Sequence, residues 1–148
     1  MVLFCNCSIA AFVANGFLSK EMAACICIDD VLSFLSSSIG KRVQAANRRG
    51  EYRAEQPFVM TFDAKNIYPE TDVEEQVLVQ GIVDVYFEED GQLVVLDYKT
   101  DKVREVSELK ERYHTQLDYY ATALSKLTGK SVKEKVIYSF TLKEEIQC

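Results

Sequence analysis

The order of apolar patterns along this 148-residue chain predicts one α/β domain: helices, then a β-meander, then a helix and a strand. A hydrophobic content of 48% with 27% charged residues is typical of a globular chain that can bury a core. Helical periodicity over residues 1–50 gives way to strand-like alternation from Gln56 onward. No linker, repeat or low-complexity segment interrupts residues 1–148. We therefore expect a helical N-terminal part over 1–50 and an α/β core over 51–148.

Capping residues divide the N-terminal part into helices. Ser19 is expected to cap a short helix, and Asp29 or Asp30 to cap the apolar-periodic "VLSFLSS". The stretch "GKRVQAANRRG" then predicts a basic helix that ends near Gly50. We expect its arginines to lie on a solvated face, with a surface that guides a nucleic-acid strand as the alternative; they are Arg42, Arg48 and Arg49.

Turn signals separate the strands of the core. "PFVMTFD" is typical of a strand, and a polar loop around Tyr68-Pro69-Glu70 follows it. "QVLVQGIVDVYFEE" and "QLVVLDYK" flank Asp90-Gly91, a strong signal for a two-residue hairpin. A long amphipathic helix, with Ser107 as its expected cap and Gly129 at its end, precedes a last strand in "VKEKVIYSFTL".

Charge and cysteine content restrict the function. A net charge of −6 argues against a free-standing nucleic-acid binder of the basic-patch kind. The two C-x-C pairs among the five cysteines do not have the usual zinc spacing, and the single histidine, His114, lies far from them. We expect buried, reduced thiols of a cytoplasmic protein. The apolar run near the N-terminus lacks a preceding basic residue and is too broken for a signal peptide or a membrane span.

Two carboxylates are predicted to meet at the end of the hairpin. If Asp90-Gly91 form the turn, Val85 faces Leu96 and Asp84 lies directly opposite Asp97. The apolar face then carries Val83, Val85, Phe87, Val94, Leu96 and Tyr98. Opposed residues have Cβ atoms about 4.5–5.5 Å apart, so the two carboxylates repel each other unless a proton or a cation intervenes.

A divalent cation resolves this conflict, because carboxylate oxygens are the ligands that Mg²⁺ or Mn²⁺ takes. Lys99 follows Asp97 by two residues and is expected on the same face, pointing at whatever the metal holds. Such a group suits attack of a metal-activated water on a phosphodiester. A surface cluster of Asp and Lys ion pairs at a strand end explains the same residues without chemistry.

Three motifs in order resemble the RecB-type branch of the PD-(D/E)XK nuclease superfamily. They are a G-h-h-D strand at 81–84, a D-x-K strand at 97–99 and a Q-x-x-x-Y helix at 116–120. The stretches "IDDVLSFLSSSIGKRVQAANRRGEYRAEQPF", "DYKTDKV" and "RYHTQLDYYATALSKLTGKSV" are further similar to the C-terminal nuclease domain of the AddA (RexA) helicase-nuclease family. This likeness runs from roughly Gly16 to Leu142.

The resemblance implies a restriction-endonuclease-like core with a mixed sheet flanked by helices. It implies a Mg²⁺- or Mn²⁺-dependent DNA exonuclease that acts in double-strand-break repair. By analogy Asp84, Asp97 and the main-chain carbonyl of Tyr98 bind the metal, and Lys99 orients or deprotonates the water. Gln116 and Tyr120 would shape the site and contact the DNA strand, although solvent exposure and core packing are their plain alternatives.

The chain also departs from that family. No histidine precedes His114, whereas the family uses one on an upstream helix as a metal ligand; His114 itself is expected on a solvated helix face. No P-loop pattern is present. We therefore expect a fragment of a larger polypeptide that carries the helicase motor domains, acting with an AddB/RexB-like partner subunit and with no membrane. The alternatives are a catalytically idle DNA- or partner-binding module and another RecB-like nuclease, from a phage or a CRISPR system.

Arg53 and Glu55, which precede Pro57-Phe58, match a stretch of the same family. We expect a structural ion pair between them; a place in the lining of the site is the alternative.

Overall fold

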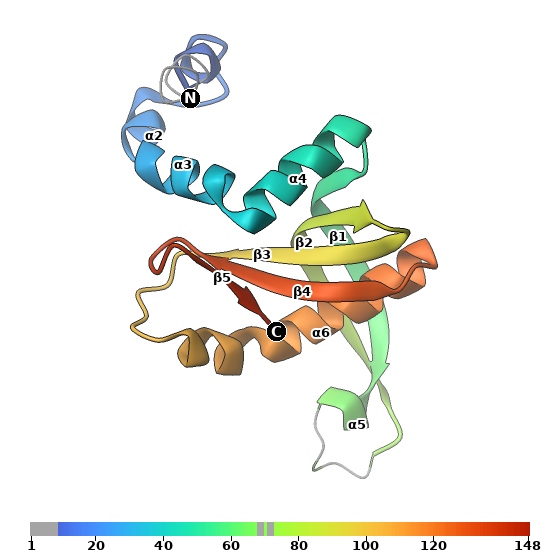
Figure 1. Ribbon diagram of the computed structural model, residues 1–148. Helices are drawn as coiled ribbons and strands as arrows, with labels where there is room; N and C mark the ends of the chain where they lie inside the picture. The colour runs from blue at the N-terminus through green and yellow to red at the C-terminus, as the bar shows by residue number, and fades with distance from the viewer. Residues whose placement is uncertain (1–8, 68–69, 71–72) are drawn as a thin grey trace.

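The computed structural model describes residues 9–67, 70 and 73–148 (Figure 1). A five-stranded sheet, ordered β1-β2-β3-β4-β5, lies between α3 and α4 on one face and α6 on the other. The helices are α2 Lys20–Ala24, α3 Ile28–Ser36, α4 Ser38–Arg49, α5 Ala64–Ile67 and α6 Val106–Thr128. The strands are β1 Tyr52–Asp63, β2 Gln76–Glu89, β3 Gln92–Lys99, β4 Val132–Ser139 and β5 Glu144–Gln147. The predicted α/β class with a mixed sheet flanked by helices is confirmed.

Strand directions follow from the connections. Antiparallel pairing joins β1, β2 and β3 into a meander, whereas α6 carries the chain back across the sheet so that β4 runs parallel to β3. β5 pairs antiparallel with β4 at one edge of the sheet. The sequence pattern does not predict this last strand, because "VKEKVIYSFTL" indicates one continuous strand, whereas the chain turns after Ser139.

The hairpin between β2 and β3 has the predicted register. Asp90 and Gly91 have φ angles of 55° and 77°, as expected for a two-residue turn with both central residues left-handed. Glu89 lies opposite Gln92, and Val85 lies opposite Leu96.

Each face of the sheet carries its own apolar core. Toward α3 and α4 the buried residues are Phe34, Ile39, Val43, Ala46, Val85, Phe87, Val94, Leu96, Val136 and Tyr138. Toward α6 they are Val83, Leu93, Val95, Val103, Leu109, Leu117, Tyr120, Leu124, Ile137 and Ile146. The expected apolar face is thus correct except for Val83. This residue packs toward α6, because β2 changes the direction of its side chains at Asp84.

The helix ends confirm some expected caps and correct others. Ser19 caps α2 by accepting a hydrogen bond from the amide of Met22, and Gly50 and Gly129 end α4 and α6 in the left-handed conformation. The expected caps at Asp29 or Asp30 and at Ser107 are wrong. α3 begins earlier, after Cys27, and α6 begins after Glu105, which forms a reciprocal capping box with Glu108.

Close approach of two helices explains Gly40. A Cβ atom at this position would lie 1.9 Å from the Phe34 carbonyl oxygen of α3. Only a glycine therefore lets α4 start directly beside the end of α3. The turn between them is fixed by Ser37, whose hydroxyl donates to the Phe34 carbonyl and accepts from the Gly40 amide.

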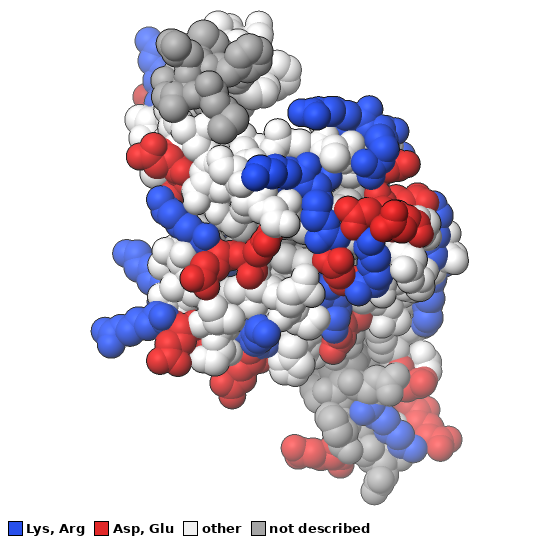
Figure 2. Space-filling view, in the orientation of Figure 1, with Lys and Arg blue, Asp and Glu red and all other residues white. Residues whose placement is uncertain are grey.

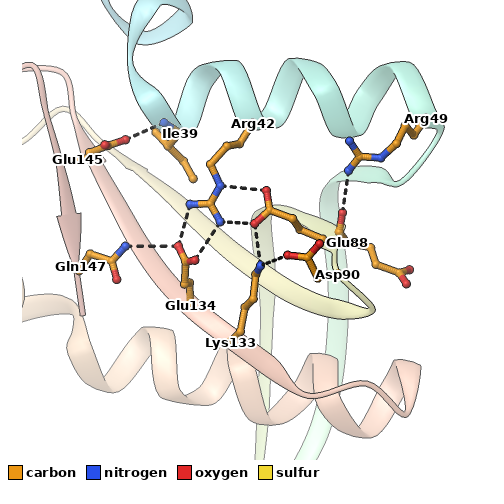
Figure 3. A network of polar contacts seen from close by, with 10 residues as sticks. Ile39, Arg42, Arg49, Glu88, Asp90, Lys133, Glu134, Glu145 and Gln147 are labelled. Carbon is orange, nitrogen blue, oxygen red and sulfur yellow. Dashed lines mark hydrogen bonds and ion pairs between the residues drawn. The ribbon is translucent and has the colours of Figure 1, made fainter.

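A half-buried ion-pair network ties α4 to the turn end of the sheet (Figure 3). Arg42 forms two hydrogen bonds with Glu89 of β2 and two with Glu134 of β4. Arg49 pairs with Glu51 and donates to the Glu88 carbonyl. Two of the three arginines of the basic helix are thus bound within the chain, so the expected fully solvated face is wrong for Arg42.

The segment before α3 is loosely covered. Residues 9–14 are helical, and Phe12, Phe17 and Met22 are half or more exposed. Cys25 and Cys27 are free thiols but exposed, so the expectation of buried cysteines is wrong for this pair. The other expected pair, Cys5 and Cys7, lies outside the described residues, as does the Tyr68-Pro69 part of the expected loop. Within the described part of the chain, no helix combines the length and hydropathy needed to cross a membrane.

The network at Arg42 predicts an acid-sensitive contribution to stability. Hydrogen bonds from Arg42, opposed by partial burial and assisted by Lys133, lower the pKa of Glu89 to about 2. The folded pKa lies below the unfolded value, so this stability is present above about pH 4.5 and is lost as the pH falls toward 2. Glu89→Gln should remove roughly 2 kcal/mol of the difference in unfolding free energy between pH 6 and pH 2.

Urea unfolding at several pH values measures this effect. Glu74→Gln is the matched control, because the Glu74 side chain is 89% exposed. Superimposable pH profiles for the wild type and Glu89→Gln would contradict the assignment.

Candidate active site

Asp84 of β2 is not paired with either neighbouring strand, β1 or β3. Pairing with β3 ends at Val85 and Leu96, so the predicted direct opposition of Asp84 and Asp97 in the ladder is not formed. In the β1 ladder, Ala54 and Gln56 are paired but Glu55 is not, and Glu55 has a φ of 51°. A glutamate in this left-handed conformation is strained, and such strain is concentrated at functional sites.

Asp84 replaces a main-chain acceptor at this break. If the hairpin register continued, the amide of Tyr98 would donate to the carbonyl of Val83. The amide instead donates to Asp84 Oδ2, at 3.0 Å. Asp84 is thereby fixed against β3 beside Asp97, and its charge contributes to the raised pKa of Asp97. The two carboxylates do converge, although through a side chain rather than through paired backbones.

Asp97 is a buried carboxylate at the centre of this group. It is 1% exposed, and its Oδ2 atom has no hydrogen-bond donor among the described residues. Lys99 Nζ lies 2.5 Å from this oxygen as an ion pair, outside the direction of a hydrogen bond. Burial raises the pKa of Asp97 to about 6; Lys99 opposes the rise and Asp84 adds to it.

A chain of polar contacts leads from Lys99 to α6. Lys99 Nζ donates to Gln116 Oε1 at 3.2 Å, and Gln116 Nε2 donates to Tyr120 Oη at 2.9 Å. Gln116 and Tyr120 lie one turn apart on the face of α6 that packs on the sheet. Burial, followed by the charges of Asp97 and Asp84, raises the pKa of Tyr120 to about 12. The three predicted motifs therefore meet at one place.

Tyr98 points to the other side of the sheet. Its ring packs against Phe34 of α3 with centroids 5.2 Å apart, and burial raises its pKa. Only the main chain of Tyr98 therefore faces the group of carboxylates, where its amide contacts Asp84; a metal-binding role of its carbonyl stays a prediction.

Three further residues form a chain of contacts that begins at Lys99, and they lie outside the G-h-h-D, D-x-K and Q-x-x-x-Y motifs. The ring of Tyr113 lies beneath the ammonium group, with 4.1 Å from Nζ to the centroid. Tyr113 Oη donates to Asp101 Oδ1 at 2.9 Å, and Arg112 pairs with the same oxygen at 2.7 Å. The available signal is the position of Tyr113, three residues before Gln116 and hence on the same helix face.

Two expectations about neighbouring residues are now decided. Arg53 donates to the carbonyls of Gly50 and Tyr52 and forms no ion pair with Glu55, so the expected pair is wrong. His114 is exposed and lies against the carbonyls of Lys110 and Glu111 on its own helix, as expected for a solvated face.

The carboxylate oxygens of Asp84 and Asp97 are suitable ligands for a hard divalent cation, but they are few. A buried, undonated Asp97 oxygen beside a second carboxylate is the environment that a cation would neutralise. Among the described residues, no group of three or more His, Cys, Asp and Glu side chains is placed to hold a metal. In the described part of the chain, the site thus offers two carboxylates, Asp84 and Asp97, as side-chain ligands.

Comparison with known proteins agrees with this geometry. A family model for the PD-(D/E)XK nuclease superfamily matches residues 19–146. This chain belongs to the PD-(D/E)XK nuclease superfamily. It is 38% identical over 91% of its length to an ATP-dependent helicase/nuclease subunit from Clostridium botulinum strain Kyoto. It is 40% identical over 87% of its length to the protein of the same name from Clostridium kluyveri strain ATCC 8527. The resemblance noted in the sequence is confirmed, and the chain spans only 10–11% of the length of these relatives.

The buried charge of Asp97 predicts a stability penalty at neutral pH. The folded pKa of about 6 lies above the unfolded value, so the penalty is absent below about pH 4 and grows as the pH rises through 6. Asp97→Asn should therefore raise the unfolding free energy by about 2 kcal/mol at pH 7.5 in metal-free buffer. Chemical denaturation at pH 7.5 and pH 4 tests this; a variant that is less stable than the wild type at pH 7.5 would contradict it.

Proposed function

We propose that this chain is a divalent-metal-dependent DNA nuclease module that hydrolyses phosphodiester bonds. The observation that carries the proposal is the single polar chain from Asp97 through Lys99 and Gln116 to Tyr120, with Asp84 beside it. Superfamily membership supports the reaction class. The site residues proposed are Asp84, Asp97, Lys99, Gln116 and Tyr120, with the main-chain carbonyl of Tyr98.

Each residue has a defined task in this proposal. Asp84 and Asp97 would hold Mg²⁺ or Mn²⁺, which when bound polarises the phosphate and lowers the pKa of an attacking water. Lys99 holds a positive charge next to Asp97, where it orients the water and offsets charge that develops on the phosphate. Gln116 accepts a hydrogen bond from the Lys99 ammonium group, which is also paired with Asp97, and Tyr120 holds Gln116 in turn.

The surface charge supports delivery of DNA by other parts of an assembly. Figure 2 shows basic and acidic side chains interspersed on the face it presents, without a broad basic surface. Arg42 and Arg49 are already bound within the chain. With a net charge of −6, long-range attraction of DNA is weak, which favours delivery of the strand to the site by a motor.

The relatives provide the setting. Because they are named ATP-dependent helicase/nuclease subunits, we propose an exonuclease that acts on strands unwound by helicase domains of the same polypeptide, in the repair of double-strand breaks. A partner subunit of the AddB/RexB kind and a cytoplasmic location belong to this proposal.

An idle module is the second candidate. The observation that favours it is the absence of a third acidic or histidine ligand among the described residues. In that case the fold contacts DNA or a partner without cutting.

Two substitutions separate the roles and the candidates. Lys99→Ala should abolish cleavage of single-stranded DNA, at least 100-fold, while Mn²⁺ binding measured by calorimetry persists, because Lys99 positions groups and does not ligate. Asp97→Ala should abolish both. Asp118→Ala, which removes an exposed carboxylate of α6 paired with Lys135, is the control and should change neither.

Calorimetry and cleavage are measured on the chain as it is and on the longer polypeptide that carries the motor. Equal Mn²⁺ binding by the wild type and Asp97→Ala would remove Asp97 from the metal site. Metal binding without cleavage in every wild-type preparation would favour the idle module.

A further inference from the structure

Lys99 has one contact, with the ring of Tyr113, that the D-x-K and Q-x-x-x-Y motifs do not account for. The D-x-K spacing accounts for the ion pair with Asp97, and the Q-x-x-x-Y helix accounts for Gln116. A lysine side chain has several rotatable bonds, so these two contacts alone leave it freedom to move. The ring face of Tyr113 makes a third contact, 4.1 Å from Nζ to the ring centroid. The side chain of Lys99 is only 14% exposed.

The tyrosine ring is itself fixed at its outer end. Tyr113 Oη donates to Asp101, which also pairs with Arg112, and the ring packs against the apolar core under α6. Asp101 lies two residues after Lys99 on the chain that leaves β3. The contacts thus close a loop from Lys99 to the ring of Tyr113, to Asp101, and back along the backbone to Lys99.

We propose that Tyr113, anchored by Asp101, is a positioning residue that sets the location of the Lys99 ammonium group. This inference rests on the proposed nuclease function and adds a residue to it. The ion pair with the buried Asp97 carboxylate, at 2.5 Å, holds the ammonium group from one side. The electron-rich ring face of Tyr113 provides a second attraction, and the Gln116 side-chain oxygen provides a third. Lys99 is thereby kept in one place, where it can reach a phosphate or a water.

A structural role for Tyr113 makes a different prediction from a positioning role. If the ring only fills space in the core, Tyr113→Leu lowers stability and leaves the turnover of folded enzyme unchanged. If the ring positions Lys99, Tyr113→Leu lowers kcat about tenfold with little change in KM, because the misplaced ammonium acts on the reacting groups. Tyr113→Phe keeps the ring face but loses the hydrogen bond to Asp101, so kcat should fall only about threefold, as in Asp101→Ala.

The first measurement needs neither metal nor DNA. In the NMR spectrum of the metal-free chain, the ε-methylene protons of Lys99, assigned with Lys99→Arg, should be shifted upfield by the ring beneath them. The shift should persist in Tyr113→Phe and disappear in Tyr113→Leu. Tyr119→Leu is the matched control, since Tyr119 lies on α6 but packs against Phe62, with ring centroids 5.0 Å apart. It should leave the Lys99 signal unchanged.

The second measurement is steady-state cleavage of single-stranded DNA by the same variants in the longer polypeptide. A full kcat in Tyr113→Leu, or an unshifted Lys99 signal in the wild type, would overturn the inference. If Tyr113→Leu does not fold, Asp101→Ala decides: we expect kcat to fall about threefold, and an unchanged kcat would overturn the inference. A wild type that does not cleave DNA contradicts the proposed function instead, so the two failures are told apart.

Discussion

The hydrogen bond from the Tyr98 amide to the Asp84 carboxylate is the contact on which the site depends. It replaces the main-chain acceptor that a regular hairpin would supply and so ends the pairing of β2 with β3. Next to this break, Val83 packs toward α6 and Glu55 is unpaired in the β1–β2 ladder. A carboxylate that serves as part of the backbone ladder is fixed more firmly than one on a free side chain. Asp84 thus lies beside Asp97 without requiring a ligand to draw the two together.

The two ends of the β2–β3 hairpin have opposite electrostatic character. At the turn end, Arg42 neutralises Glu89 and Glu134, and Lys133 completes the pairing with Glu89 and Asp90 (Figure 3). At the other end, Asp84 and Asp97 share a single nearby cation, Lys99, among the residues that the structure describes. Excess negative charge in a buried setting destabilises the fold, and this cost is typical of a site that is completed by a metal ion. Helices packed on both faces hold the strands together against that repulsion.

Much of this arrangement is predictable from the sequence, because local rules decide it. Asp90-Gly91 determines the turn and therefore the register, and the three motifs place Asp84, Asp97, Lys99, Gln116 and Tyr120 on the correct elements. The direct Asp84–Asp97 pair and the face of Val83 are wrong, since a side chain competes with the backbone for an amide and alternation alone does not include this. The solvent exposure expected for Arg42 is wrong because its partners, Glu89 and Glu134, are distant in sequence. Exposure of Cys25 and Cys27 is missed for a similar reason: an apolar composition does not say whether another element covers the segment.

The location of a bound cation tests the central claim most directly. Sub-stoichiometric Mn²⁺, added to the ¹⁵N-labelled chain, broadens the NMR signals of amides near the ion. We expect selective broadening at Asp84, Asp97 and Tyr98, with the amides of Glu89 and Glu134 at the far end of the hairpin unaffected. Broadening centred instead on the acidic segment around Glu74 and Glu75, with sharp signals at Asp84 and Asp97, would show that these two carboxylates do not form a metal site.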